Sequence, residues 1–176
     1  MKAIVLPYGG VSPRIPPSAF LAPGAVVVGD VEVGERAGIW FYAVVRGDVS
    51  PVSIGEGTNI QDGCVLHGQM GEWDVRVGKN VTLGHHAIVH GSVVEDDVLI
   101  GMGSRILNGC QIGSGSIVAA GAVLREGTKV PPGSLVAGVP AEVRREVRKE
   151  ELETIRNSAL HYIEYAKSYR ALFGPG

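Results

Sequence analysis

Three of the five histidines in this 176-residue chain lie within six residues, in the segment 83–91, and a fourth, His67, lies 18 residues before His85. Imidazole is the commonest protein ligand for transition metals, and three imidazoles that leave one position open are typical of a catalytic zinc site. Sequence spacing alone does not bring these side chains together. Their arrangement depends on the elements that carry them.

A six-residue repeat runs through most of the chain and carries these histidines. Its first position is Ile, Leu or Val in all 20 copies, although these three types make up only 49 of the 176 residues. Four places later the residue is small in 18 of the 20 copies. The first positions are Ile15, Leu21, Val27, Val33, Ile39, Val45, Ile54, Ile60, Leu66, Val77, Leu83, Val89, Val94, Ile100, Ile106, Ile112, Val118, Leu124, Val130 and Val136.

A period of six with one branched aliphatic and one small inward residue predicts a short strand followed by a corner. Three such sides close a triangular coil of 18 residues, and successive coils pair through parallel ladders ~4.8 Å apart. One copy cannot bury its apolar side chain alone, so we expect stability to come from stacking about six and a half coils. The predicted fold is therefore all-β, with a parallel β-helix domain over residues 1–140 in which residues 1–14 cap the first coil.

The repeat is interrupted after Val45, Leu66 and Val89, always between side three and side one of a coil. We therefore expect loops to leave the prism along one edge, the longest of them being residues 68–74. Beyond the repeat, apolar residues recur at spacings of three to five, which predicts an amphipathic helix over residues 141–176 that opens at Pro140, either continuous or broken near Lys149, and packs on the β-helix.

Composition excludes several classes of protein. A formal net charge of −2, with no basic stripe before residue 144, argues against a nucleic-acid surface. The short apolar run after Met1 ends at Pro7, which is too short for a signal sequence or a membrane span, so we expect a cytoplasmic protein. Cys64 and Cys110 both occupy small inward positions two coils apart, which predicts core packing and no disulfide.

The repeat places two histidines side by side. His67 follows Leu66 and His90 follows Val89, so both point outward from side three in consecutive coils. They should lie about one strand spacing apart, ~4.8 Å, which is close enough for both to bind one metal ion. Arg46 heads the same column one coil earlier.

His85 lies elsewhere, at the corner that ends side two, together with Gln61 one coil earlier. Five extended residues, roughly 13–16 Å, separate His85 from His90, so it cannot complete a site in its own chain. A neighbouring chain packed against side three could present its own His85 there, and three such interfaces close into a homotrimer. His86 and His161 lack this register and are interpreted as surface residues.

The chain resembles the gamma-class carbonic anhydrases, a trimeric left-handed β-helix family among the hexapeptide-repeat proteins. The similarity covers nearly the whole chain from residue 15 onward. It rests on the segments Arg-Gly-Asp at 46–48, Asn-Ile-Gln-Asp at 59–62, His67 with the glycine that follows, Gly-His-His-Ala-Ile-Val-His-Gly at 84–91, and Gly-Val-Pro-Ala at 138–141. The last of these recurs across hexapeptide proteins generally.

This resemblance implies a left-handed helix and assigns roles to individual residues. The metal would be Zn²⁺, with Fe²⁺ or Co²⁺ as alternatives. Arg46 and Asp48 would form an ion pair at the subunit interface, Asn59 and Gln61 would orient water and substrate, and Tyr162 would either reach the site or stay exposed. The implied metal ligands are His67, His85 and His90.

The activity implied by the resemblance is reversible hydration of CO₂ to bicarbonate by a metal-bound hydroxide. One branch of the family uses glutamates of an acidic loop as proton shuttles; here Val49 follows Asp48, and Glu72 or Asp74 would have to substitute. Two alternatives stay open: a hexapeptide-type acyltransferase with one histidine as general base, and a metal-binding or assembly protein with little activity.

Overall fold

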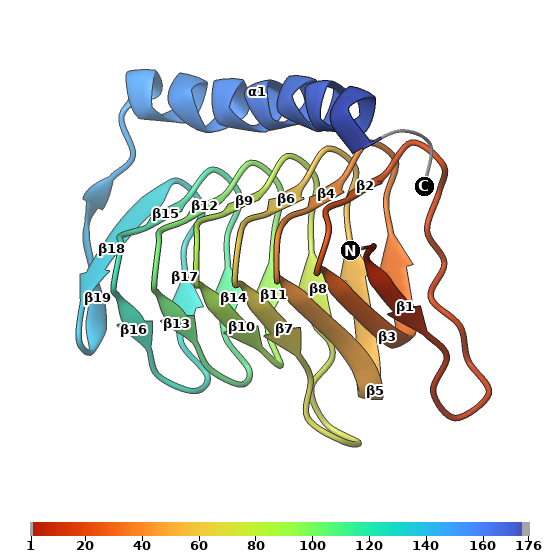
Figure 1. The fold of residues 1–176 in the computed structure, drawn as a ribbon. Coiled ribbons are helices and arrows are strands. Elements are labelled where there is room, and N and C mark those ends of the chain that lie inside the picture. Colours follow the sequence, from red (N-terminus) through yellow and green to blue (C-terminus); the bar gives the residue numbers. More distant parts are fainter. Residues whose placement is uncertain (1, 174–176) are drawn as a thin grey trace.

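The computed structural model describes residues 2–173, which form a parallel β-solenoid of about seven turns followed by helix α1 (Lys149–Phe173). Figure 1 shows the coils stacked in one direction, with α1 lying along one flank of the stack. The prediction of a β-helix with a C-terminal helix is confirmed.

The column of aliphatic residues predicted from the repeat forms the core. Of its 20 members, 18 are at most 4% exposed, and the exceptions are Ile15 and Leu21 in the first coil. Cys64 and Cys110, at small inward positions of the repeat, are buried free thiols, as predicted, and burial raises the pKa of Cys64 to about 12. Stacking of like residues therefore removes nearly all of this aliphatic surface from water.

Side two of the prism forms one sheet of eight strands. Its members pair in parallel up to the last strand, which pairs antiparallel. In chain order they are β2 (Phe20–Leu21), β4 (Gly38–Ile39), β6 (Asn59–Ile60), β9 (Thr82–Leu83), β12 (Leu99–Ile100), β15 (Ile117–Val118), β18 (Ser134–Gly138) and β19 (Ala141–Glu146).

Sides three and one form a second sheet of 11 strands, because β5 runs through the corner and pairs with strands of both sides. The strands are β1 (Ile4–Leu6), β3 (Val26–Val33), β5 (Val44–Ile54), β7 (Val65–His67), β8 (Val75–Val77), β10 (Ile88–His90), β11 (Val93–Val94), β13 (Arg105–Ile106), β14 (Gln111–Ile112), β16 (Val123–Leu124) and β17 (Lys129–Val130).

The three interruptions of the repeat do fall along one edge, but they are not all loops. Residues 46–53 remain within β5, because β3 continues alongside and supplies backbone partners. Residues 68–74 form a hairpin closed by a bridge between Gln69 and Trp73, and it projects from the stack between β7 and β8 (Figure 1).

The small inward residue is displaced at each interruption. Val49, Met70 and Val93, which lie four places after a core position, are not buried. Val52, Val75 and Ser92, which lie two places before the next core position, are at most 1% exposed and fill the corner instead. At an interruption, the small inward residue is therefore placed by its distance before the next core residue, and not by its distance after the preceding one.

The first strand does more than cap the prism. β1 pairs in parallel with β3, so Ile4 lies in register with Val26 and the side-three ladder begins before the first repeat. The sequence shows no repeat in this segment because its apolar residues are exposed and fill no coil interior.

The helix begins at Lys149, later than the predicted start at residue 141. Residues Ala141–Glu146 instead form β19, which folds back antiparallel onto β18. The last coil would otherwise present unpaired backbone groups along β18, and an antiparallel strand satisfies them. The apolar spacing of Val143 and Val147 misled the prediction, since Val143 is 52% exposed.

Helix α1 packs along side two, against β2, β4, β6 and β9. Its buried residues recur at spacings of three and four and contact the outer face of the sheet. None of the helices among the described residues combines the length and apolar character needed to cross a membrane. The buried helix residues are Ile155, Ala159, Ile163 and Ala166.

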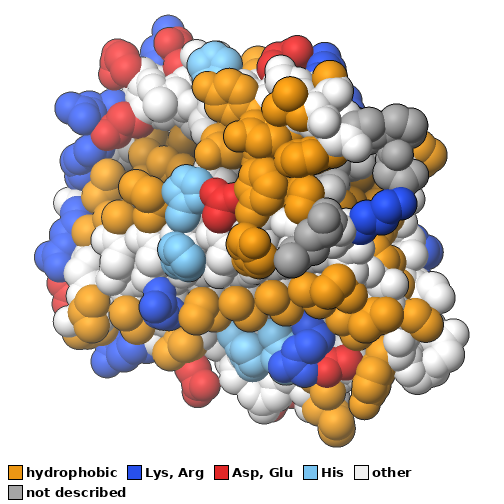
Figure 2. Space-filling model, in the orientation of Figure 1, with side chains coloured by type: hydrophobic (Ala, Val, Ile, Leu, Met, Phe, Trp, Pro, Cys, Tyr) orange, Lys and Arg blue, Asp and Glu red, His pale blue; other side chains and the backbone are white. Residues whose placement is uncertain are grey.

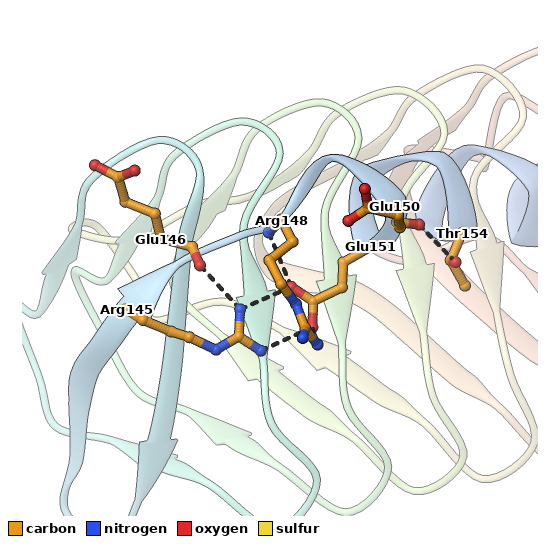
Figure 3. A network of polar contacts seen from close by, with 6 residues as sticks. All are labelled: Arg145, Glu146, Arg148, Glu150, Glu151 and Thr154. Carbon is orange, nitrogen blue, oxygen red and sulfur yellow. Dashed lines mark hydrogen bonds and ion pairs between the residues drawn. The ribbon is translucent and has the colours of Figure 1, made fainter.

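A network of charged side chains fixes the start of α1 (Figure 3). The Glu151 carboxylate accepts hydrogen bonds from the guanidinium groups of Arg145 and Arg148, at 2.7–2.9 Å. It also accepts one from the backbone N–H of Arg148, which is the helix N-cap, at 2.9 Å. These donors, chiefly Arg145 and then Arg148, hold the pKa of Glu151 well below its ordinary value.

Core substitutions test the phase of the repeat. Ile106→Asp would place an unpaired charge where the side chain is fully buried, and we expect it to abolish folding at a cost of several kcal/mol. Val77→Ala removes two methyl groups and should lower the free energy of unfolding by about 2 kcal/mol. Both are read from denaturant unfolding, and an Ile106→Asp protein as stable as wild type would contradict the assigned phase.

Glu151→Gln tests the network at the helix start. A carboxylate whose pKa is lowered in the folded state stabilises above its unfolded pKa, ~4.3, and loses that contribution as pH falls through the folded pKa. Glu151→Gln should therefore lower the thermal midpoint at pH 7, and its difference from wild type should shrink below about pH 4. Glu153→Gln, on the exposed side of the helix, is the matched control and should show a smaller difference at pH 7.

Candidate metal centre

His67 and His90 lie next to each other on side three. His67 ends β7 and His90 ends β10, and the two residues are partners in the parallel ladder, as are Arg46 and His67. Because the preceding residues Leu66 and Val89 are fully buried, both imidazoles point outward. His67 Nδ1 lies 3.1 Å from His90 Nε2. The predicted pairing of the two rings is confirmed.

The other ring nitrogen of His67 faces a carboxylate. His67 Nε2 lies 3.1 Å from Asp48 Oδ1, and the other oxygen of Asp48 accepts a hydrogen bond from Arg46. Burial opposes ionisation of Asp48, but bonds from Arg46, its own backbone and His67 outweigh it and lower the pKa of Asp48. Asp48 is thus an ionised acceptor, so the proton of His67 resides on Nε2.

The other ring nitrogen of His90 faces an amide oxygen. His90 Nδ1 lies 2.6 Å from Oδ1 of Asn108, in the corner one coil further along. A carbonyl oxygen only accepts, so the proton of a neutral His90 resides on Nδ1. The two nitrogens that face each other, His67 Nδ1 and His90 Nε2, then both carry lone pairs.

These two lone pairs fit a cation. Tetrahedral coordination at ~2.0–2.1 Å places ligand nitrogens roughly 3.3 Å apart, close to the 3.1 Å seen between the two rings. Burial, and then the positive charge of Arg46, lower the pKa of His67, so its ring is neutral at pH 7, the form that binds metal. The donor set therefore suits a transition-metal ion with at least one more ligand to come.

His85 lies on another part of the same face. It follows β9 at the corner that ends side two, and its Nδ1 lies 2.7 Å from Asp62 Oδ2. Asp62 is itself fixed by the backbone N–H of Phe41, at 3.2 Å. Among residues 2–173, no group of three His, Cys, Asp or Glu side chains is placed to hold one metal ion. The structure thus brings His67 and His90 together and leaves His85 apart, as the spacing predicted.

A row of outward side chains, aliphatic except for Arg105, separates the two sets of histidines. Ladder partners form this row on side three, and Figure 2 shows it crossing the face with histidine side chains on both sides of it. We call it the side-three row. Its members are Ile4, Val26, Val44, Val65, Ile88, Arg105 and Val123.

Gln61 and Asn59 are buried on side two, near His85. Gln61 Oε1 accepts a hydrogen bond from the backbone N–H of His85 at 3.2 Å, and Gln61 Nε2 donates to Asn59 Oδ1 at 3.2 Å. Asn59 in turn donates to Thr82 Oγ1 at 2.9 Å. Gln61 therefore belongs to the corner of His85, not to the His67–His90 pair of its own chain.

Tyr162 lies on α1 and is half-buried on the side that faces the prism. Its ring packs edge-on against Trp40 with centroids 5.2 Å apart. Burial raises the pKa of Tyr162, and the charge of Asp62 adds to the rise. Its hydroxyl therefore stays protonated and lies within range of the charge of Asp62.

The two carboxylates of the hairpin differ. Asp74 is held by Ser50 and Arg76, whose hydrogen bonds lower its pKa, whereas Glu72 is exposed and accepts only a 3.1 Å bond from Gln69. Sequence reasoning assigned no role to Asp62 or Asn108. The coil register does place Asp62 opposite His85, but nothing in the repeat indicates that Asn108 contacts His90.

Family models match the repeat region. A model of the bacterial transferase hexapeptide (six repeats) matches residues 91–126, and a model of the hexapeptide repeat of succinyl-transferase matches residues 74–107. A structure of a proposed acetyltransferase from Bacillus cereus superposes with a TM-score of 0.95 at 41% identity, covering 98% of this chain and 99% of that one. The chain is thus a left-handed β-helix protein of the hexapeptide-repeat class.

Similar proteins show which family within the hexapeptide-repeat class the chain belongs to. The chain is 40% identical to a carbonic anhydrase of Geobacillus kaustophilus, covering 96% of this chain and 92% of that protein. It is 41% identical to gamma carbonic anhydrase 1, mitochondrial, of Arabidopsis thaliana over 91% of this chain, and spans 60% of that relative's length. It is also 41% identical to the carnitine operon protein CaiE of Escherichia coli, covering 88% and 79%. The chain belongs to the gamma carbonic anhydrase family.

Proposed function

We propose that the protein is a gamma-type carbonic anhydrase that hydrates CO₂ reversibly to bicarbonate with a divalent metal ion, Zn²⁺ being the first candidate and Fe²⁺ or Co²⁺ the alternatives. The observation that carries this proposal is the His67–His90 pair, whose facing nitrogens both hold lone pairs because Asp48 and Asn108 accept the protons of the other two. Membership of the family supports the same function.

The third ligand comes from a neighbouring subunit in this proposal. His85 uses Nδ1 to contact Asp62, which leaves Nε2 free to face outward. The side-three row would supply the apolar contact between subunits, since aliphatic side chains on an outer sheet face gain by being covered. Repetition of one such interface around a three-fold axis closes a homotrimer with three sites.

Different residues of the chain have different roles in the proposed reaction. A divalent ion held by these imidazoles would lower the pKa of water from 15.7 to ~7, the value typical of zinc in carbonic anhydrases, and so would make a nucleophile available at neutral pH. Asp48 and Asn108 hold the imidazoles of His67 and His90. Gln61, oriented by Asn59, offers a buried amide to water or substrate beside His85.

Arg46 and Tyr162 complete the set. Arg46 holds the ionised Asp48 in place and adds a positive charge beside the site, which favours a bicarbonate anion. Tyr162 offers a protonated hydroxyl within range of the charge of Asp62. Glu72 is the exposed carboxylate of the hairpin and can exchange a proton with solvent or buffer, whereas Asp74 is committed to Ser50 and Arg76.

An acyltransferase is the second candidate, because the Bacillus cereus structure carries that description. Acyl transfer to or from a coenzyme A thioester needs one histidine as general base. Acyl transfer therefore gives no role to the second imidazole of the His67–His90 pair, or to the acceptors that hold the outer nitrogens of both rings. Formation of free thiol from acetyl-CoA, unchanged in a His67→Ala variant, would favour this candidate.

Loss of any one imidazole should empty the site. We expect close to one zinc or other divalent ion per chain in the wild type, and little in His67→Ala, His85→Ala or His90→Ala, each of which should keep the folded β-helix because these side chains lie outside the core. His161→Ala is the control. Metal analysis gives the content, and a variant that keeps its metal removes that residue from the ligand set.

The activity should follow the metal. CO₂ hydration by the zinc- or Fe²⁺-loaded wild type should rise with pH through an apparent pKa of ~7, because the ion would lower the pKa of water to that value. No hydration at any pH, in protein that holds its metal, would contradict the proposed reaction and favour a metal-binding or assembly role.

Mixing two inactive variants tests the shared site. Equal amounts of His67→Ala and His85→Ala are unfolded and refolded together, so that about three-quarters of trimers are mixed. Each mixed trimer has one interface where intact His67 and His90 meet an intact His85, which restores about a quarter of wild-type sites. Metal content that stays at the level of the separate variants would contradict a site shared between subunits.

A further inference from the structure

Asn108 contacts His90 as the last member of a chain of hydrogen bonds that starts in the hairpin 68–74. Gln69 Nε2 donates to Glu72 Oε2 at 3.1 Å, so Gln69 Oε1 is left to accept from Asn108 Nδ2. Asn108 Nδ2 also faces Glu126 Oε1 at 3.4 Å. At the end of this chain of hydrogen bonds, Asn108 Oδ1 lies 2.6 Å from His90 Nδ1.

The direction of this chain is fixed at its ends by carboxylates. Glu72 and Glu126 can only accept hydrogen bonds, so the amides of Gln69 and Asn108 must both turn their nitrogens toward the hairpin side. A flipped Asn108 would place its oxygen against the oxygens of Gln69 and Glu126. The oxygen of Asn108 therefore faces His90, which sets the His90 proton on Nδ1 and the lone pair on Nε2, next to His67.

Trp73 of the hairpin packs against two glycines of the prism and so fixes the position of the hairpin. A Cβ at Gly109 would lie 3.2 Å from the ring of Trp73, and a Cβ at Gly91 would lie 2.7 Å from its Cβ. Both glycines have positive φ, at 70° and 54°, so any other residue there would also be strained. Trp73 thereby lies against the two coils that carry His90 and Asn108, and Gln69 and Trp73 bridge through their backbones.

We propose that the hairpin 68–74 and Asn108 act as a positioning device for His90. Asn108 is the positioning residue, and Gln69 and Trp73 hold it in register. The device selects the tautomer of His90 that presents Nε2 toward His67. This role rests on the proposed metal site, but the selection of the His90 tautomer is expected in the metal-free protein as well.

The two imidazoles are therefore held by different means. His67 is held by Asp48, which lies in the extended strand β5 of its own sheet, whereas His90 depends on a segment that projects from the prism. Partners that orient metal-binding histidines typically change metal affinity by about 10- to 100-fold when they are removed. The hairpin is thus expected to set the affinity of the site while contributing little to the stability of the core.

The direct test is the tautomer of His90 in the metal-free full-length protein. Two-bond ¹H–¹⁵N correlation spectra at pH 8 should show the proton on Nδ1 in the wild type and a mixture of tautomers in Asn108→Ala. Asn108→Asp keeps an acceptor oxygen and should restore the Nδ1–H form. A wild-type His90 that carries its proton on Nε2, or a tautomer unchanged in Asn108→Ala, would overturn the proposal whether or not the protein binds metal.

Zinc affinity, measured by competition with a chelator, is the second readout. Asn108→Ala, Gln69→Ala and Trp73→Ala should each weaken binding, the first by about 10- to 100-fold. Asn80→Ala is the matched control, because Asn80 Nδ2 also donates to a carboxylate at a corner, Asp97, away from the histidines. It should lower the thermal midpoint without changing affinity.

The outcomes separate this proposal from the proposed function. A wild type that binds no metal but shows the predicted His90 tautomers would sink the metal site and leave the positioning device standing. Equal zinc affinity in wild type and Asn108→Ala would sink the positioning role and leave the metal site standing. Loss of affinity in Asn80→Ala as large as in Asn108→Ala would mean that stability alone controls binding, and would overturn the positioning role as well.

Discussion

Parallel pairing between successive coils is the constraint on which the rest of the molecule depends. Most strands are short, often two residues, and cannot exist without the coils before and after them. The ladder keeps like positions opposite each other even where the coil length changes. His67 and His90 are 23 residues apart and still pair directly, because the hairpin 68–74 absorbs the extra residues outside the prism.

Pairing brings imidazoles together but does not decide which nitrogens face each other. That choice depends on acceptors beyond the ladder, Asp48 for His67 and Asn108 for His90. The first acceptor is supplied by β5, which, like β3, continues through the corner where the strands of later coils stop. The second is oriented from the hairpin. Two of the three departures from a regular repeat on this edge therefore serve the same pair of side chains.

The sequence predicted the features that a strict period controls, namely the buried column, the stacking of His67 on His90 and the separation of His85. It could not predict β19, because pairing at the end of a solenoid depends on an open strand edge and not on apolar spacing. It also missed Asn108, since a corner residue has no fixed orientation until Gln69 and Trp73 lie against it. Side-chain hydrogen bonds at irregular segments carry no periodic signal.

A site shared between subunits would link metal binding to assembly. A monomer offers two imidazoles, and the third arrives only when the face that bears the side-three row is covered by a neighbour. A ligand that binds one state of a protein stabilises that state by RT ln(1 + [L]/Kd), which is about 2.7 kcal/mol at 100 times Kd. With three sites per trimer this contribution would count three times. The tautomer chosen by Asn108 would thereby affect the stability of the assembly as well as the affinity of one site.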